Sequence, residues 1–225
     1  FLPLLLREKA LINTSLSRMN DSSSGTDLSP PGAIHPVAVC GKVDSISRFQ
    51  FIYTPDMKHN SICILGGTGF VGSNIIKVAL ERYNAAVFST AYSSLPEGAP
   101  GLEYGRVNML DPQQVRNSVR TFQPNAIIHA AILNNFERMY QDRTLAWQAY
   151  VNSTRFLVRA ANEVGAKIIL VSSDWVFDGT QVDADEFTPP NPINLYGVLK
   201  LVAETVVMET AENGALARVS AVNGV

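Results

Sequence analysis

The sequence predicts an α/β protein built on a doubly wound parallel sheet with helices on both faces. Short, continuously apolar runs recur along the chain, and segments with apolar residues at helical spacing separate them. No internal repeat of solenoid length interrupts this alternation. Parallel sheets of this kind bind their ligands at the carboxyl ends of the strands, where we expect the functional residues to lie.

Most of the strands are predicted from short runs rich in apolar residues. The run Lys167–Ser172 is the most strand-like segment of the chain, and Ile62–Leu65 ends directly in glycines. Runs of this type suit strands that are buried on both faces of a sheet. In order, the predicted strands cover residues 62–65, 85–90, 105–108, 125–131, 167–172 and 215–222.

The helices are predicted from apolar periodicity and from residues that start or stop a helix. Asp111 is suited to cap a helix that has Pro112 at its first position, and Gly165 is suited to end another. In order, the predicted helices cover about residues 71–83, 111–122, 144–164 and 194–212.

Composition excludes several classes of protein. The 225 residues are 46% apolar, which is enough for one core, and the net charge of -2 gives no basic excess for a nucleic acid. No apolar run approaches the length of a membrane span. Two cysteines and three scattered histidines predict neither a disulfide framework nor a metal site. We expect a soluble, cytoplasmic protein, and a homodimer is left open.

Residues 1–56 differ from the rest of the chain. They contain Ser-rich and Pro-Gly segments, Ser22–Gly25 and Ser29–Gly32, and few periodic apolar positions. Such a segment cannot bury enough surface to offset the entropy of ordering it. We therefore expect residues 1–56 to be disordered or loosely packed, and the folded domain to cover residues 57–225.

A glycine-rich loop follows the first of the strands in this domain. Gly66, Gly69 and Gly72 have GxxGxxG spacing between a predicted strand and a predicted helix. Glycines let the backbone approach a pyrophosphate closely, and the helix start supplies N–H donors and a positive dipole end. A strand, a loop and a helix in this order predict a Rossmann-like domain that binds NAD or NADP rather than a bare turn.

The second predicted strand lacks the acid that usually binds the ribose 2′-hydroxyl of NAD. Ser89 and Thr90 stand at its end, and the first acid after them is Glu97. Loss of that carboxylate removes a repulsion toward a 2′-phosphate, although no Arg or Lys replaces it nearby in the sequence. The pattern favours NADP over NAD, and both stay candidates.

Three residues have the chemistry for carbonyl reduction. Tyr196 and Lys200 are four apart, so they share one face of a predicted helix, and Ser173 follows the fifth strand. A nearby ammonium lowers the pKa of a phenol, which can then give a proton to a carbonyl oxygen, while a serine hydroxyl orients that oxygen. Spacing alone would favour a surface pair, and it is the position after the strand that ends in serine, in a chain with a dinucleotide loop, that favours the catalytic interpretation.

Longer motifs identify a resemblance over residues 61–225. The segments Phe122–Ala131, Val151-Asn152, Val171–Gly179 and Asn194–Lys200 resemble the extended short-chain dehydrogenase/reductase family, and among its members the dTDP-4-dehydrorhamnose reductases. This resemblance implies a reductase of a keto nucleotide-diphosphate sugar. It also implies that most of a smaller substrate domain lies beyond Val225.

The resemblance assigns roles residue by residue. It implies a catalytic set of Ser173, Tyr196 and Lys200 and no metal ligand. The residues that it implies for the cofactor site are Gly66, Thr68, Gly69, Phe70, Val71, Gly72, Asn108, Met109, Ala130, Ala131, Tyr196 and Lys200.

Two other functions remain open on the same residues. The regulatory beta subunit of methionine adenosyltransferase resembles this chain in the run Ser172–Thr180, and such a subunit binds a dinucleotide and a partner without turnover. A nucleotide-sugar epimerase or dehydratase would use the same scaffold.

Overall fold

The computed structural model describes residues 37–38, 61–92, 95–181 and 183–220. These residues belong to one compact unit, Ile34–Val225, while the other, Phe1–Ala33, lies outside the described residues. Of the segment 1–56, only Val37–Ala38 is described, and it forms a short strand, β1. The domain boundary near residue 57 therefore stays a prediction.

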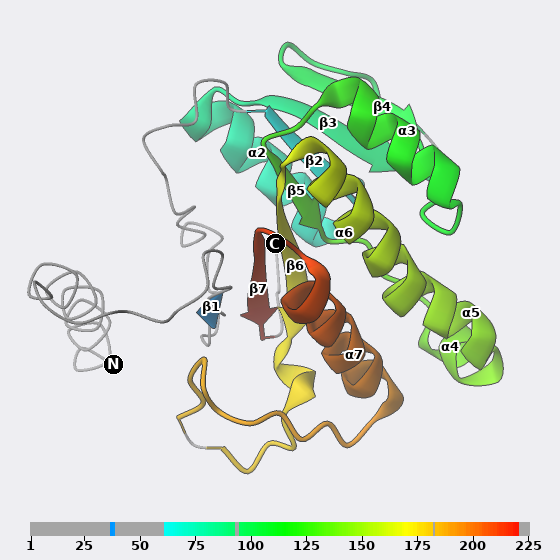
Figure 1. Cartoon of the computed structure of the whole chain (residues 1–225), viewed down its shortest axis with the longest axis vertical. Coiled ribbons are helices and arrows are strands. Elements are labelled where there is room, and N and C mark those ends of the chain that lie inside the picture. The colour runs from blue at the N-terminus through cyan, green and yellow to red at the C-terminus, as the bar shows by residue number, and fades with distance from the viewer. Residues whose placement is uncertain (1–36, 39–60, 93–94, 182, 221–225) are drawn as a thin grey trace, which may run out of the picture. The chain divides into compact units, whose positions relative to one another are not determined.

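Among the described residues, seven parallel strands form one sheet in the order β1-β7-β6-β5-β2-β3-β4 (Figure 1). The chain places β3 and β4 on one side of β2 and then returns to place β5 on the other side. This reversal confirms the doubly wound fold, and α/β proteins bind ligands at such a switch point. The strands after β1 are β2 (Ser61–Leu65), β3 (Ala86–Ala91), β4 (Leu102–Arg106), β5 (Ala126–His129), β6 (Lys167–Ser173) and β7 (Gly214–Val219).

Helices cover both faces of the sheet. Buried residues of α3, α6 and α7 share one core with Cys63 and Leu65 of β2, whereas α2 packs with Ile62 and Ile64. Successive strand residues point to opposite faces, so β2 enters both cores, which explains its unbroken apolar run. The helices are α2 (Phe70–Tyr83), α3 (Pro112–Phe122), α4 (Phe136–Gln141), α5 (Arg143–Trp147), α6 (Ser153–Val164) and α7 (Leu195–Thr210).

The helix ends confirm the capping residues that the sequence predicts. The Asp111 carboxylate accepts hydrogen bonds from the N–H groups of Gln113 and Gln114, at 2.9 and 3.2 Å, and Pro112 opens α3. Gly165 ends α6 with a φ of +68°, a conformation that costs glycine little.

Two predicted elements differ from the structure. The third strand covers Leu102–Arg106 instead of Gly105–Asn108, because a turn at Gly101 lets Leu102 and its successors pair with β3. The helix predicted over residues 144–164 is broken by a π-helical turn, η2 (Gln148–Asn152), between α5 and α6. The short helix α4 was not predicted.

A buried ion pair joins α7 to β7. Arg218 donates from Nε and Nη2 to the Glu204 carboxylate at 3.0 and 2.7 Å, and the two side chains are 11% and 3% exposed. The guanidinium also lies 5.1 Å from the centroid of the Phe177 ring. A second pair, Arg116 with Glu163, is 45% and 38% exposed, so solvent screens it.

We predict that Arg218→Met lowers the free energy of unfolding by about 3–5 kcal/mol, because it leaves the Glu204 charge buried without a partner. The double variant Glu204→Met/Arg218→Met should recover most of this loss. Arg116→Met at the exposed pair is the matched control and should cost less than about 1 kcal/mol. Urea unfolding measures all three, and a single variant as stable as the double would contradict the prediction.

Candidate active site

The glycine loop connects β2 to α2 and lies against the end of β5. Gly66 has a φ of +85°, and a Cβ at this position would lie 2.7 Å from backbone atoms of Ala131. A Cβ on Gly72 would collide with the carbonyl oxygen of Gly66, so the start of α2 packs directly on the loop. Only glycine satisfies both contacts, which accounts for the spacing in the sequence.

The start of α2 is suited to an anion. Gly69 is its N-cap residue, and no side chain caps the helix there. Thr68, Gly69 and Phe70 are exposed. An uncapped helix start beside a glycine backbone presents N–H donors and the positive end of the helix dipole, which fits a pyrophosphate.

The hydroxyls at the end of β3 lie beneath this loop. Thr90 Oγ1 accepts a hydrogen bond from the Gly66 N–H at 3.4 Å. Ser89 is fully buried, its Oγ has no hydrogen-bond partner among the described residues, and a Cβ on Gly67 would collide with it. The side chains of Thr90 and Ser89 therefore contact the loop backbone at Gly66 and Gly67.

The structure brings Ser173, Tyr196 and Lys200 together at the carboxyl end of β6. The Ser173 side chain lies close enough to Tyr196 to lower its pKa, and its hydroxyl donates to the Asp174 carboxylate at 3.2 Å. Lys200 Nζ lies 5.8 Å from the centroid of the Tyr196 ring and donates to the carbonyl oxygen of Val171 at 2.8 Å. The helical spacing thus places the phenol and the ammonium on the side of α7 that faces β6.

A glycine allows this close approach. A Cβ on Gly197 would collide with the carbonyl oxygen of Trp175, which lies in the 3₁₀ turn η3 (Asp174–Val176) directly after β6. The Asn194 side chain caps α7 by accepting from the Gly197 N–H at 2.8 Å. The sequence analysis missed both residues, although the Tyr-Gly pair was a usable signal.

Aromatic rings surround Tyr196. The centroids of Phe136, Tyr150 and Trp175 lie 5.6, 5.8 and 5.6 Å from its centroid, all in edge-on geometry. Phe136 and Trp175 are 45% and 49% exposed, so they form an apolar wall on the solvent side. This arrangement fixes the direction of the phenol and favours a partly apolar ligand beside it.

The pKa of Tyr196 corrects one expectation. Burial raises it above the ordinary value, while the nearby Ser173 side chain lowers it and the neighbouring Asp174 carboxylate raises it. Burial therefore outweighs the expected lowering by Lys200, whose Nζ bonds to Val171 and whose own pKa burial lowers to about 8.

A buried histidine, His129, lies near Lys200. His129 ends β5, its Nε2 is 3.4 Å from Ser153 Oγ, and its Nδ1 has no partner among the described residues. Burial lowers its pKa to about 3, and the positive charge of Lys200 adds to the effect. His129 is therefore neutral at physiological pH. It connects the Lys200 region to Ala130 and Ala131, on which Gly66 packs.

The other predicted cofactor residues follow strand ends or the glycine loop. Asn108 and Met109 follow β4, and the Asn108 side chain accepts from the Leu110 N–H at 3.0 Å. Ala130 and Ala131 follow β5 and are half-buried, as is Val71 in the first turn of α2. All of them lie toward the carboxyl edge of the sheet.

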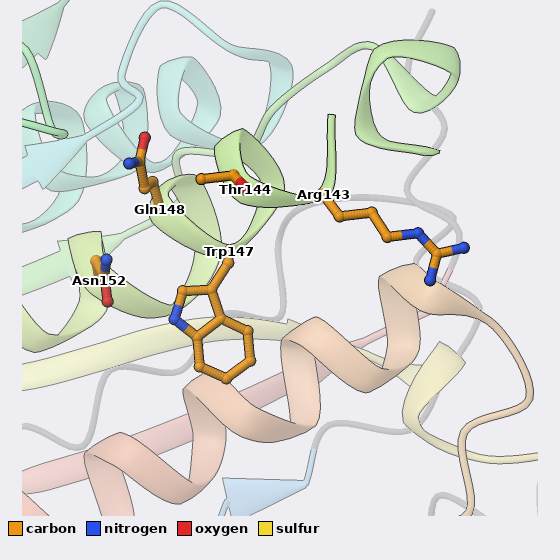
Figure 2. Close-up of a pocket in the computed structure, with 5 residues that line it drawn as sticks. All are labelled: Arg143, Thr144, Trp147, Gln148 and Asn152. Carbon is orange, nitrogen blue, oxygen red and sulfur yellow. The ribbon is translucent and has the colours of Figure 1, made fainter. Parts of the chain in front are cut away.

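A separate shallow pocket of about 340 Å³ lies on the helical stretch from α5 to η2. Figure 2 shows its lining residues on this one stretch. None of the predicted site residues lines it, and its side chains come from one helical stretch, so the chemistry is not placed there. The lining residues are Arg143, Thr144, Trp147, Gln148 and Asn152.

Comparison with models of protein families shows to which family this chain belongs. Residues 60–225 match the family model described as the RmlD substrate binding domain. The chain belongs to this family. The match covers every site residue described above, and it confirms the expected likeness to dTDP-4-dehydrorhamnose reductases.

Individual relatives fall into two groups. Methionine adenosyltransferase 2 subunit beta of Xenopus tropicalis is 35% identical over 161 residues, which is 72% of this chain and 46% of the relative. The dTDP-4-dehydrorhamnose reductase of Salmonella typhimurium is 30% identical over 111 residues, or 49% and 37% of the two chains.

A solved structure of such a reductase is also similar to this chain. The dTDP-4-dehydrorhamnose reductase of Bacillus anthracis, in complex with NADP, is 25% identical with a TM-score of 0.60. The match covers 72% of this chain and 54% of that one. This chain thus spans about half the length of these relatives. Among the described residues, no helix is long and apolar enough to cross a membrane.

We predict that His129 makes the protein acid-sensitive. Its pKa is about 3 in the folded state and near 6.5 when unfolded, so the unfolded state binds a proton that the folded state does not. The free energy of unfolding should therefore fall as the pH drops below 6.5, by up to about 1.4 kcal/mol per pH unit.

Urea unfolding between pH 7.5 and 5.5 measures this slope. The variant His129→Asn should have a flatter profile over that window, whatever its stability at pH 7.5. An equally steep profile in the variant would assign the acid sensitivity to other groups.

Proposed function

We propose that this protein binds NADP(H) or NAD(H) and reduces a keto group on a nucleotide-diphosphate sugar. The observation that carries the proposal is the meeting of Ser173, Tyr196 and Lys200 at the end of β6. In the sheet, β6 is separated from β2 and its glycine loop only by β5. The complex of the Bacillus anthracis reductase with NADP supports the choice of cofactor.

The glycine loop fits the dinucleotide. Gly66, Gly67 and Gly72 let the loop pack closely on Ala131, on Ser89 and on itself, and the first turn of α2 has no side-chain cap. These groups would hold the pyrophosphate. The predicted contacts at Asn108, Met109, Ala130 and Ala131 would line the adenine and nicotinamide sides, in agreement with their place at the strand ends.

The bound cofactor would supply a hydride to the carbonyl carbon. Tyr196 would give its phenol proton to the carbonyl oxygen, and burial keeps that proton in place until the oxygen accepts it. Ser173, whose side chain lies near Tyr196, would orient the oxygen. Lys200, with a pKa of about 8, stays mostly protonated at neutral pH and would stabilise the phenolate that remains.

We predict that Tyr196→Phe lowers kcat by about 10²–10⁴-fold, because it removes the proton donor. Cofactor oxidation with dTDP-4-dehydrorhamnose as substrate measures the turnover, and a fluorescence titration with NADPH measures binding, which should be unchanged.

Tyr83→Phe is the matched control, since Tyr83 ends α2 and so lies away from the carboxyl ends of the strands. Turnover by Tyr196→Phe at the level of this control would overturn the catalytic assignment. An epimerase would interconvert sugars without net consumption of cofactor, so the same assay separates that function.

A second function is favoured by the 35% identity to methionine adenosyltransferase 2 subunit beta. A regulatory subunit would use the same fold to bind a dinucleotide and a catalytic partner without hydride transfer. The bond from Lys200 to Val171, instead of to the phenol, is compatible with such a role.

We predict different outcomes for the two functions. A regulatory subunit would co-elute with a methionine adenosyltransferase catalytic subunit in size-exclusion chromatography, and Tyr196→Phe would leave this complex intact. A reductase would show substrate-dependent NADPH oxidation and no complex. Co-elution without turnover would replace the reductase proposal by the regulatory one.

A further inference from the structure

The fold brings an arginine, Arg106, next to the end of β3, although the two are far apart in the sequence. Near the end of β3 the sequence offers no Arg or Lys, yet the parallel register pairs Ala91 of β3 with Arg106 of β4. The N–H of Val107 donates to the carbonyl oxygen of Ala91 at 3.2 Å, so this pairing extends past the last residue of β4. Arg106 is therefore one strand away from the end of β3.

The side chain of Arg106 lies on the same face of the sheet as α2. A Cβ on Gly105 would collide with the Phe88 ring, and Val107 belongs to the core that contains α3, so both face the opposite side. Strand residues alternate, and Arg106 must point to the α2 face. Tyr104, two residues earlier, packs in the α2 core and confirms this direction.

The glycine loop occupies that same face. Ser89, two residues before Ala91, lies against Gly67 and Ile76, which belong to the loop and to α2. Ala91 and Arg106 are the next positions toward the carboxyl edge, and Arg106 is exposed there. Neighbouring strands are about 4.8 Å apart, a distance that an arginine side chain spans easily.

Chemistry then indicates the ligand. In dinucleotide-binding sheets, the ribose 2′ position lies at the end of the second strand, which is β3 here. An acid at this position would select a 2′-hydroxyl, but the described residues that end this strand, Ala91 and Tyr92, are not acids. A guanidinium binds phosphate through two parallel hydrogen bonds and keeps its charge at any physiological pH.

We infer that Arg106 binds the 2′-phosphate of NADP(H) and makes this protein select NADP(H) over NAD(H). The inference rests on the proposed dinucleotide site and adds the residue that decides between the two cofactors. It replaces the sequence-based expectation that no cation takes the place of the missing acid.

Titration of the whole chain with NADPH and with NADH, followed by nicotinamide fluorescence, tests the inference. The wild-type protein should bind NADPH at least about 10-fold more tightly than NADH. Arg106→Gln should weaken NADPH binding by about 10–100-fold, as expected for loss of a charge-assisted contact, and should leave NADH binding within about 2-fold. Arg106→Lys should retain part of the preference.

Arg120→Gln is the matched control, because Arg120 is an exposed arginine in the last turn of α3. It should leave both affinities unchanged. Equal NADH binding by wild type and Arg106→Gln also shows that the variant is folded.

The outcomes separate this inference from the proposed function. If the wild-type protein binds neither cofactor, the dinucleotide site fails and the inference fails with it. If both cofactors bind and Arg106→Gln keeps the preference for NADPH, or weakens both affinities equally, the role of Arg106 is wrong while the dinucleotide site stands.

Discussion

The packing of the first turn of α7 against the backbone of Trp175 is the contact on which the candidate site depends. Because Gly197 has no side chain, the helix approaches η3 closely enough for Tyr196 to reach Ser173. One turn further along, Lys200 is buried against β6 and bonds to Val171. A larger residue at position 197 would move the whole helix start and separate the hydroxyl groups.

Burial governs the electrostatics of this region. Lys200 and His129 are both almost fully buried, and each has a pKa below its ordinary value because water is excluded from its charge. Glu204, one turn after Lys200, partly counters this effect for the lysine, and Arg218 balances Glu204 in turn. The charge of Glu204 therefore favours the protonated lysine, and Glu204 in turn pairs with Arg218 of β7.

Much of the fold could be predicted from the sequence, because its signals are local. The apolar runs of β2 and β6, the cap at Asp111 and the glycine at 165 each act within a few residues of their own position. The Tyr196 and Lys200 pair was visible for the same reason, since one helical turn relates the two residues.

The sequence could not show what depends on neighbouring strands or on burial. The strand at Leu102–Arg106 has alternating polar residues, and only its pairing with β3 reveals it. The same pairing places Arg106 beside Ala91, fifteen residues away in sequence. The pKa of Tyr196 was misjudged because the expected effect of a nearby ammonium is smaller than the effect of the rings that exclude water.

The π-helical turn η2, between α5 and α6, limits where residues can be added to or removed from this helical stretch. Tyr150 within it faces the Tyr196 ring, and Ser153 just after it faces His129. A π-helical turn holds one residue more than an α-helical turn, so deleting one residue between them would convert the turn to α-helix and change the spacing of these two contacts. An insertion or deletion in this turn would therefore disturb both contacts at once.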